Sequence, residues 1–197
     1  MTQVAKHQLK WRLADVEGKG TDQVSIVMPE LDSEQPREIL LPTDIPSPHP
    51  TAVDLRWTED DLSLFFLLLE KMLEWPMDED HPLDLTDEGI IEVLHVVAAA
   101  RFITPLPAED MLGEDIPTIH YEWDVGDIIA INTFDGFKSA VIVALDSIDA
   151  TCVLLDEIDG HEEYFDFEVF DTLIVNKHSI LPGEFGNVSP ASEAVIH

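Results

Sequence analysis

The chain has 197 residues and a mass of 22.1 kDa, and 45% of its residues are hydrophobic, which suits one or two folded domains. Its charge is extreme, because 41 acidic residues stand against 10 basic ones and give a formal net charge of −31. This balance argues against direct binding to nucleic acid or to an anionic membrane surface, since both need a basic patch.

Cysteine content and the start of the chain bear on location. The single cysteine, Cys152, lies in an apolar run and can form no internal disulfide, which is typical of a reducing compartment. Residues 1–10 are polar and lack the apolar stretch of a secretory signal. The longest apolar run, residues 62–69, is less than half a membrane span. We therefore predict a cytoplasmic protein.

Residues 1–56 are predicted to form β-structure followed by a proline-rich loop. Polar and apolar residues alternate over 8–16, a glycine-rich turn follows, and 23–28 is again mostly apolar, which predicts a hairpin. A third short strand is expected at 37–41. Four closely spaced prolines then predict a loop without regular structure: Pro42, Pro46, Pro48 and Pro50.

Two helices are predicted next. Thr58 followed by Asp61 is a capping pattern that opens a helix from about residue 59 to residue 75. Thr86 is expected to cap a second helix over 87–102. A short loop joins the two, so we expect a helical hairpin.

From residue 117 onward the pattern changes to short strands separated by turns that contain aspartate and glycine. The expected strands are 117–123, 127–133, 138–145, 151–157, 163–170 and 172–175. Short strands at this spacing predict a small antiparallel barrel, and the tail from Pro182 is expected to be loosely ordered.

The predicted fold class is therefore α+β, with an N-terminal β-hairpin, a central two-helix hairpin and a C-terminal small antiparallel SH3-like β-barrel. Four parts are expected along the chain. They are a β-hairpin region with its proline-rich loop (1–56), a helical hairpin (57–113), a small barrel (114–181) and a flexible tail (182–197).

The SH3-like assignment comes from a resemblance carried by residues 125–175. A Gly-Asp pair, an apolar strand, an Asp-Gly turn and a second strand follow one another over 125–143, and 153–162 continues this rhythm. The segment resembles small SH3-like barrels such as Tudor domains and barrel-type bacterial immunity proteins. In Tudor domains the resemblance implies capture of a methylated ligand by an aromatic cage. Here the aromatic residues do not form a cage pattern, so the resemblance implies the barrel and no ligand: Phe137, Tyr164, Phe165 and Phe167.

No motif in the sequence predicts catalysis. It lacks a Gly-x-Ser-x-Gly elbow, a glycine-rich phosphate loop and a His-Glu-x-x-His pair. His161 and Glu162 beside Asp156 and Asp159 are residue types that bind divalent ions, but their spacing does not match an EF-hand loop. His95 is expected to be an ordinary helix histidine. We predict no catalytic residues, no cofactor and no bound metal.

The acidic residues are concentrated in the C-terminal half. Residues 104–176 hold eighteen acids and one base. On the expected strand 163–170, Asp166 and Glu168 share one face, and the opposite face carries Phe165, Phe167 and Val169. Ten acidic residues form the predicted partner-binding surface: Asp146, Asp149, Asp156, Glu157, Asp159, Glu162, Glu163, Asp166, Glu168 and Asp171.

The scale of this charge suggests a role. The charge of −31 equals that on about 50 Å of duplex DNA. A globular protein of 197 residues is only about 40 Å across its long dimension, so its charge per unit length is comparable to that of DNA. Our first hypothesis is a non-enzymatic protein that blocks a basic, nucleic-acid-binding protein surface, as a DNA-mimic inhibitor of phage or plasmid origin or as a toxin immunity protein. An ordinary solvated acidic surface, an adaptor whose barrel binds a peptide while its helices form a dimer, and a metal-assisted hydrolase stay as alternatives.

Overall fold

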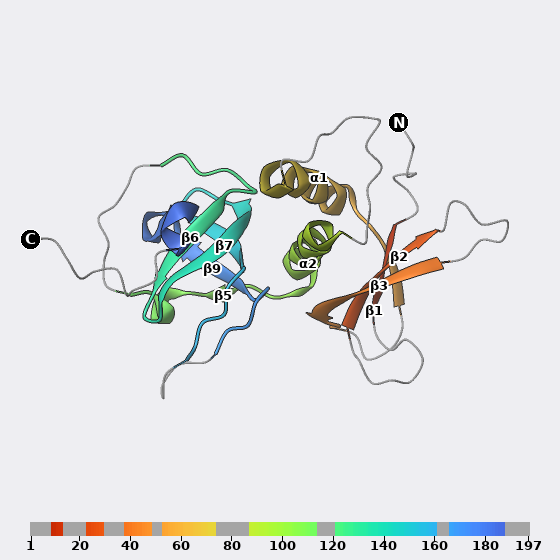
Figure 1. Ribbon diagram of the computed structural model, residues 1–197, viewed down its shortest axis with the longest axis horizontal. Helices are drawn as coiled ribbons and strands as arrows, with labels where there is room; N and C mark the ends of the chain where they lie inside the picture. The colour runs from red at the N-terminus through yellow and green to blue at the C-terminus, as the bar shows by residue number, and fades with distance from the viewer. Residues whose placement is uncertain are drawn as a thin grey trace, which may run out of the picture. The chain divides into compact units, whose positions relative to one another are not determined.

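The computed structural model describes residues 9–13, 23–29, 38–48, 53–73, 87–113, 121–160 and 166–187. The chain divides into two compact units, Met1–Phe102 and Ile103–His197 (Figure 1). The first contains a sheet and two α-helices, and the second contains a larger sheet with short 3₁₀ turns. The described residues therefore form a mixed α+β protein.

The sheet of the first unit has four strands. They are β1 (Lys10–Leu13), β2 (Gln23–Pro29), β3 (Glu38–Pro46) and β4 (Val53–Arg56), arranged in the order β3-β2-β1-β4. β1 and β2 pair antiparallel with Trp11 opposite Ile26, which confirms the predicted hairpin.

The proline-rich segment differs from the prediction. β3 continues through Pro42 and Pro46, which lie opposite Ser25 and Gln23 of β2. The expected loop is therefore wrong over this stretch. β3 lies at the edge of the described sheet, where a proline without an N–H can be accommodated because only one side of the strand is paired. β4, which the sequence did not predict, pairs with β1.

The two predicted helices are present as α1 (Glu59–Leu73) and α2 (Glu88–Phe102). They lie side by side in Figure 1. A Cβ atom added to Gly89 would lie 2.8 Å from Cδ2 of Leu73, so the end of α1 meets the start of α2, as in the expected helical hairpin. The cap of α2 is Asp87, whose Oδ1 accepts from the N–H of Gly89 at 2.9 Å and of Ile90 at 3.4 Å. Thr86, the expected cap, lies outside the described residues.

A buried carboxylate joins α1 to the sheet and to α2. Asp61 Oδ2 accepts from the Thr58 N–H at 2.8 Å, and Thr58 Oγ1 accepts from the Asp61 N–H at 3.2 Å, so the predicted capping pattern is confirmed. The same oxygen accepts from Trp11 Nε1 at 3.3 Å, and Arg101 Nε of α2 lies 4.0 Å from Asp61 Oδ1. Asp61 is only 5% exposed. A carboxylate can be buried to this extent because these donors replace its hydrogen bonds to water.

Trp11, which donates to this carboxylate, belongs to a cluster of aromatic rings. Trp11 stacks on Trp57 with ring centroids 4.6 Å apart, and Phe102 meets the edge of Trp11 at 5.4 Å. Phe65 of α1 contacts Trp57 edge to face at 5.6 Å. Strand β1, the loop before α1 and both helices therefore each contribute a ring to one aromatic cluster.

The sheet of the second unit has six strands in the order β10-β6-β7-β8-β9-β5. Their bounds are β5 (Leu106–Pro107), β6 (Ile128–Thr133), β7 (Gly136–Leu145), β8 (Asp149–Leu154), β9 (Thr172–Asn176) and β10 (Ile180–Pro182). Neighbouring strands are antiparallel except β5 and β9, which are parallel. Three 3₁₀ turns accompany them: η1 (Glu109–Met111), η2 (Lys177–Ser179) and η3 (Gly183–Asn187).

The predicted small SH3-like barrel is wrong. In the part of the chain that the structure describes, β10 and β5 are the two edges of an open six-stranded sheet and do not pair with each other. The edge strand β5 comes from Leu106–Pro107, a segment that ends the helical region in sequence and was not expected to join the sheet. No local sequence pattern predicts the parallel pairing of β5 with β9, because this pairing is a tertiary contact.

The expected strand 163–170 is also wrong over its described part. Phe167 makes only an isolated bridge to Ile158, and Glu168–Asp171 form a turn in which Phe170 has a φ of +74°. As a result Phe167 is buried, whereas Val169, expected on the same apolar face, is 41% exposed. Residues 161–165 lie outside the described residues.

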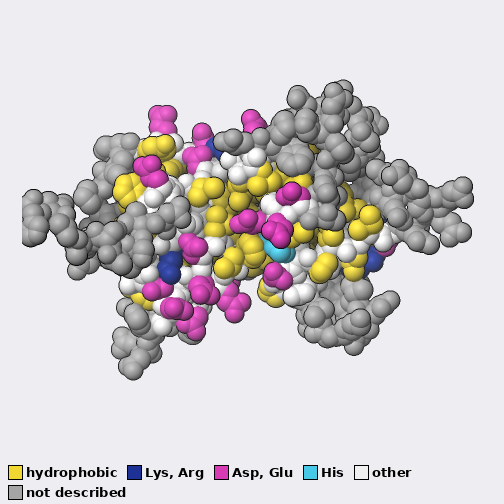
Figure 2. Space-filling model, viewed as in Figure 1, with side chains coloured by type: hydrophobic (Ala, Val, Ile, Leu, Met, Phe, Trp, Pro, Cys, Tyr) yellow, Lys and Arg dark blue, Asp and Glu magenta, His cyan; other side chains and the backbone are white. Residues whose placement is uncertain are grey.

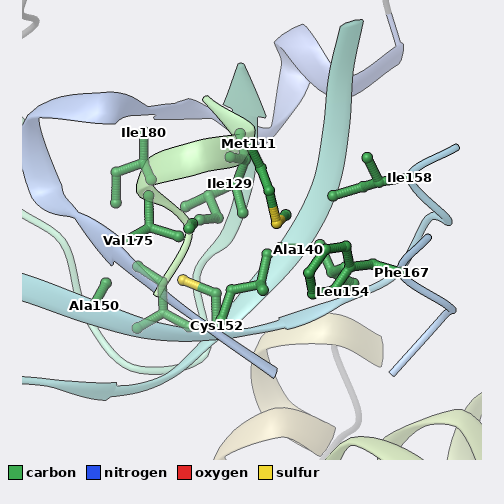
Figure 3. Packing of buried hydrophobic residues seen from close by; sticks show 14 residues of the cluster. Met111, Ile129, Ala140, Ala150, Cys152, Leu154, Ile158, Phe167, Val175 and Ile180 are labelled. Carbon is green, nitrogen blue, oxygen red and sulfur yellow. The ribbon is translucent and has the colours of Figure 1, made fainter. Parts of the chain in front are cut away.

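The core of this unit forms against one face of its sheet (Figure 3). Ile129, Ala140, Cys152, Leu154 and Val175 contribute from successive strands. The 3₁₀ turn η1 adds Met111 from a segment tied to β6, since the Phe134 N–H donates to the Met111 carbonyl at 3.1 Å. Burial raises the pKa of the Cys152 thiol to about 12, which keeps it protonated and unreactive.

Replacing Asp61 with alanine is expected to lower the free energy of unfolding by about 2–4 kcal/mol, because the buried Trp11 N–H and the Thr58 N–H lose their acceptor. Urea unfolding followed by tryptophan fluorescence measures this change. The neighbouring exposed acid is a matched control, and Asp60→Ala is expected to cost less than about 1 kcal/mol. Equal effects of the two substitutions would show that Asp61 acts only through the helix dipole.

Candidate functional site

Negative charge is the chemical feature that most distinguishes the second unit. It contains twenty acidic residues and two lysines, a formal net charge of −18, whereas the first unit has a net charge of −13. Both lysines bind groups of their own unit. Lys138 Nζ lies 2.7 Å from Asp135 Oδ2, and Lys177 Nζ donates to the backbone carbonyl of Asp146.

Two cations of the first-unit sheet, Arg12 and Lys10, are paired as well. Arg12 holds Asp54 with Nε 2.8 Å from Oδ1 and a second nitrogen 2.9 Å from Oδ2, and it also binds Glu38 at 3.0 Å. This bidentate contact lowers the pKa of Asp54 and raises that of Arg12. Lys10 Nζ lies 3.8 Å from Glu38. Arg12 and Lys10 therefore pair with acidic residues of their own sheet.

Backbone N–H groups hold four acidic side chains at one end of the second sheet. Asp156 Oδ2 accepts from Ser139 at 2.7 Å, and Asp135 Oδ2 accepts from Asp159 at 3.1 Å. Asp166 Oδ1 accepts from Gly160 at 2.8 Å, and Asp171 Oδ2 accepts from Glu168 at 2.9 Å. These bonds tie together the start of β7, the end of β8 and the turn before β9.

We call this region the acidic end. It consists of Asp135, Asp156, Glu157, Asp159, Asp166, Glu168 and Asp171. Among the described residues, Lys138 is the one basic residue that forms an ion pair with a member of the acidic end, Asp135. Figure 2 shows several acidic side chains close together on the second unit, near the position of β5 in Figure 1.

Three members of the acidic end differ from the others. Glu157, Asp159 and Glu168 are exposed, and their carboxylates form no hydrogen bond or ion pair with the part of the chain that the structure describes. The acidic end thus combines carboxylates fixed by backbone donors with carboxylates that face solvent. Such a mixture can present negative charge at defined positions to a cationic surface.

The ten predicted residues do not all come together. Asp146 and Asp149 lie at the turn between β7 and β8, at the other end of these strands from Asp156. Ser139, which binds Asp156, is six residues before Leu145 along β7, so the two places are about 20 Å apart. Glu162 and Glu163 lie outside the described residues.

The sequence interpretation missed Asp135 and Lys138. A signal was present, since Asp135 stands in the Asp-Gly turn that was recognised between two strands. That pattern indicates a turn, but it contains no information that the Asp135 carboxylate accepts from Asp159, 24 residues later.

The described residues contain no group of three or more histidine, cysteine, aspartate or glutamate side chains placed to hold a metal ion. His161 and Glu162, considered above for metal binding, lie outside this part of the chain. Half-buried His95 lies 3.9 Å from Asp44, and its pKa is lowered because burial outweighs the nearby carboxylates. Within the same described ranges, no helix is both long and apolar enough to cross a membrane.

Comparison of the sequence with models of known protein families found no match, and neither did comparison with curated proteins.

Replacing Asp156 with alanine is expected to lower the free energy of unfolding by about 1–2 kcal/mol, because the Ser139 N–H loses a charged acceptor. Chemical denaturation of the full chain measures this change. Glu157→Ala removes the same charge one residue later without removing a hydrogen bond, and we expect it to leave stability within about 0.5 kcal/mol of wild type. A larger loss in the Glu157 variant would contradict the assignment.

Asp146 predicts a pH dependence. The N–H groups of Asp149 and Ile148 donate to its carboxylate, which lowers the pKa of Asp146, with Lys177 adding to the effect. A lowered pKa in the folded state stabilises the fold above the unfolded value near 4, and this contribution is lost as the pH falls through the folded pKa. Wild type is therefore expected to exceed Asp146→Asn in stability at neutral pH and to lose this advantage in acid.

Urea unfolding of both proteins between pH 7 and about pH 2 measures this difference. Glu157→Gln serves as the control for loss of one negative charge. A constant difference between wild type and Asp146→Asn across the whole range would show that the ionised carboxylate of Asp146 contributes nothing.

Proposed function

We propose that this chain is a non-enzymatic acidic protein that binds and blocks a basic, nucleic-acid-binding surface of another protein. It would act as a DNA-mimic inhibitor or as a toxin immunity protein, two roles that share one recognition chemistry. The observation that carries the proposal is the acidic end, where backbone donors hold carboxylates in place and one lysine is present.

Charge explains why such a surface favours a cationic partner. The acidic end keeps most of its negative charge, because Asp156, Asp166 and Asp171 are held by neutral backbone groups and Lys138 pairs only with Asp135. Uncompensated like charges repel one another in the folded unit, and a basic surface relieves this repulsion. Opposite potentials also accelerate association and disfavour neutral or acidic partners.

Fixed geometry supports the same function. A carboxylate already held by a backbone N–H loses less conformational freedom on binding than a freely rotating one, so less of the interaction energy is lost to ordering. Asp156 and Asp166 are held in this way, and exposed Glu157 and Asp159 lie between them along the chain. The segment after β8 can therefore present an ordered row of negative groups, as a nucleic-acid backbone does.

The test begins with capture of binding proteins on the immobilised full chain, followed by mass-spectrometric identification and purification of the captured protein. We expect a basic protein that acts on nucleic acid, whose binding weakens with salt and is displaced by duplex DNA. The triple variant Glu157→Gln, Asp159→Asn, Glu168→Gln is expected to bind this protein about tenfold more weakly at low salt, since each exposed ion pair contributes up to about 1 kcal/mol.

A matched control carries the same charge change in the first unit: Asp60→Asn, Glu70→Gln and Glu92→Gln, all exposed positions on the two helices. We expect this control to bind within about twofold of wild type at moderate salt, because screening weakens charges outside the contact. Equal losses in the two triple variants would mean that total charge alone matters. Capture of only neutral proteins, whose binding is unaffected by salt or by competing DNA, would contradict the proposed function.

A further inference from the structure

The turn between β7 and β8 exposes an apolar side chain at its tip. Ile148 is 62% exposed, the highest value among the large hydrophobic side chains of the described residues, and Asp146 and Asp149 flank it in sequence. Single exposed apolar residues are ordinary on protein surfaces and require no function. At this tip, three further features accompany the exposed isoleucine.

The first feature is that the tip is held in place from several sides. Asp146 Oδ1 accepts from the Ile148 N–H at 2.7 Å and from the Asp149 N–H at 2.8 Å. The Ile148 carbonyl accepts from the Lys177 N–H at 3.1 Å, and Lys177 Nζ donates to the Asp146 carbonyl. Both backbone polar groups of Ile148 are therefore satisfied within the unit, and its side chain is presented on an ordered backbone.

The second feature is an uncharged row of residues on the sheet next to the tip. Ala144 of β7 pairs with Thr151 of β8, Thr151 pairs with Ile174 of β9, and Ile174 pairs with Pro107 of β5. Directly paired residues share a face of the sheet, so these four lie in one row across four strands. Ile174 is 38% exposed, and Ala144 and Pro107 are exposed as well. A strip without charge thus crosses a unit whose net charge is −18.

The third feature is a pair of aspartates beside the tip, Asp146 and Asp149. Asp149 pairs with Asn176, and this pair lies one row closer to the tip than Thr151 and Ile174. Asp146 precedes Ile148 by two residues, and its carboxylate is held by the two N–H groups named above. Lys177, which donates to the Asp146 carbonyl, adds one positive charge, so these three charged residues together carry a formal charge of −1. An apolar centre with charged residues at its edge is the usual composition of a binding hot spot.

Charge selects among the occupants of this surface. A second copy of this chain would bring another net charge of −31 against the first, and like charges disfavour such a pair. A cationic partner gains at the aspartates while it covers the isoleucine. We propose that Ile148 is the apolar anchor of the contact with a basic protein, inserting into an apolar pocket rimmed by lysine or arginine.

This inference rests on the proposed function and deepens it, because it adds a second, chemically different contact about 20 Å from the acidic end. Burial of an isoleucine side chain is insensitive to salt, whereas the carboxylates of the acidic end act through screened charge. The two contacts can therefore be separated by measuring affinity as a function of salt.

The experiment uses the full chain and the purified basic protein identified by capture. Ile148→Thr, which keeps the branched Cβ and removes apolar volume, is expected to weaken binding by about tenfold or more at both low and high salt. The slope of log affinity against log salt should stay that of wild type. Ile148→Leu restores apolar volume and should bind within about threefold of wild type. Ile39→Thr, at a position 42% exposed in the first unit, is the matched control and should have no effect.

Each outcome has one meaning. If Ile148→Thr binds as wild type while the triple variant of the acidic end loses affinity, the anchor is rejected and the blocking function stands. If Ile148→Thr loses affinity while salt and the triple variant have no effect, the anchor stands and the blocking function is rejected. A dimer of wild type in sedimentation analysis that Ile148→Thr dissociates would show that a second copy occupies the tip, and would overturn the proposal. Circular dichroism and the urea midpoint confirm that the exposed substitution leaves the fold intact.

Discussion

Aspartate side chains that accept hydrogen bonds from backbone N–H groups shape both units. With 41 acidic residues and 10 basic ones, the chain cannot pair most of its carboxylates with cations. Backbone donors are the neutral alternative. Asp61 and Asp87 use donors at helix starts, Asp146 uses donors in a turn, and Asp156 uses a donor in strand β7. This arrangement satisfies the backbone and leaves the negative charge in place.

The surface of the second unit follows from that constraint. Its two lysines are engaged by Asp135 and by the Asp146 carbonyl, while Glu157, Asp159 and Glu168 face solvent without a described partner. A fold of this kind maintains a strong negative potential that the unit itself cannot neutralise. In the blocking function we propose, a cationic surface of another protein would supply the missing charge.

Distribution of this charge is uneven across the second sheet. Negative groups occupy the two ends of the long strands β7 and β8, whereas Ala144, Thr151 and Ile174 cross them without charge. Strands of this length separate the two ends by about 20 Å, so a partner that covers both would meet charged and apolar contacts in one interface. Affinity from apolar burial and selectivity from charge could then be set by different residues.

Local patterns in the sequence determined the hairpin of β1 and β2, the two helices and the Thr58–Asp61 cap, because alternation, helical periodicity and capping involve residues close in the chain. Only the tertiary structure decided that β3 continues through its prolines at a sheet edge, that β5 pairs with β9 at the edge of an open sheet, and that the Asp135 carboxylate accepts from Asp159. It also separated Asp146 and Asp149 from the acidic end. These outcomes depend on which distant strands pair and in which register, and hydrophobic spacing along one segment carries no information about that choice.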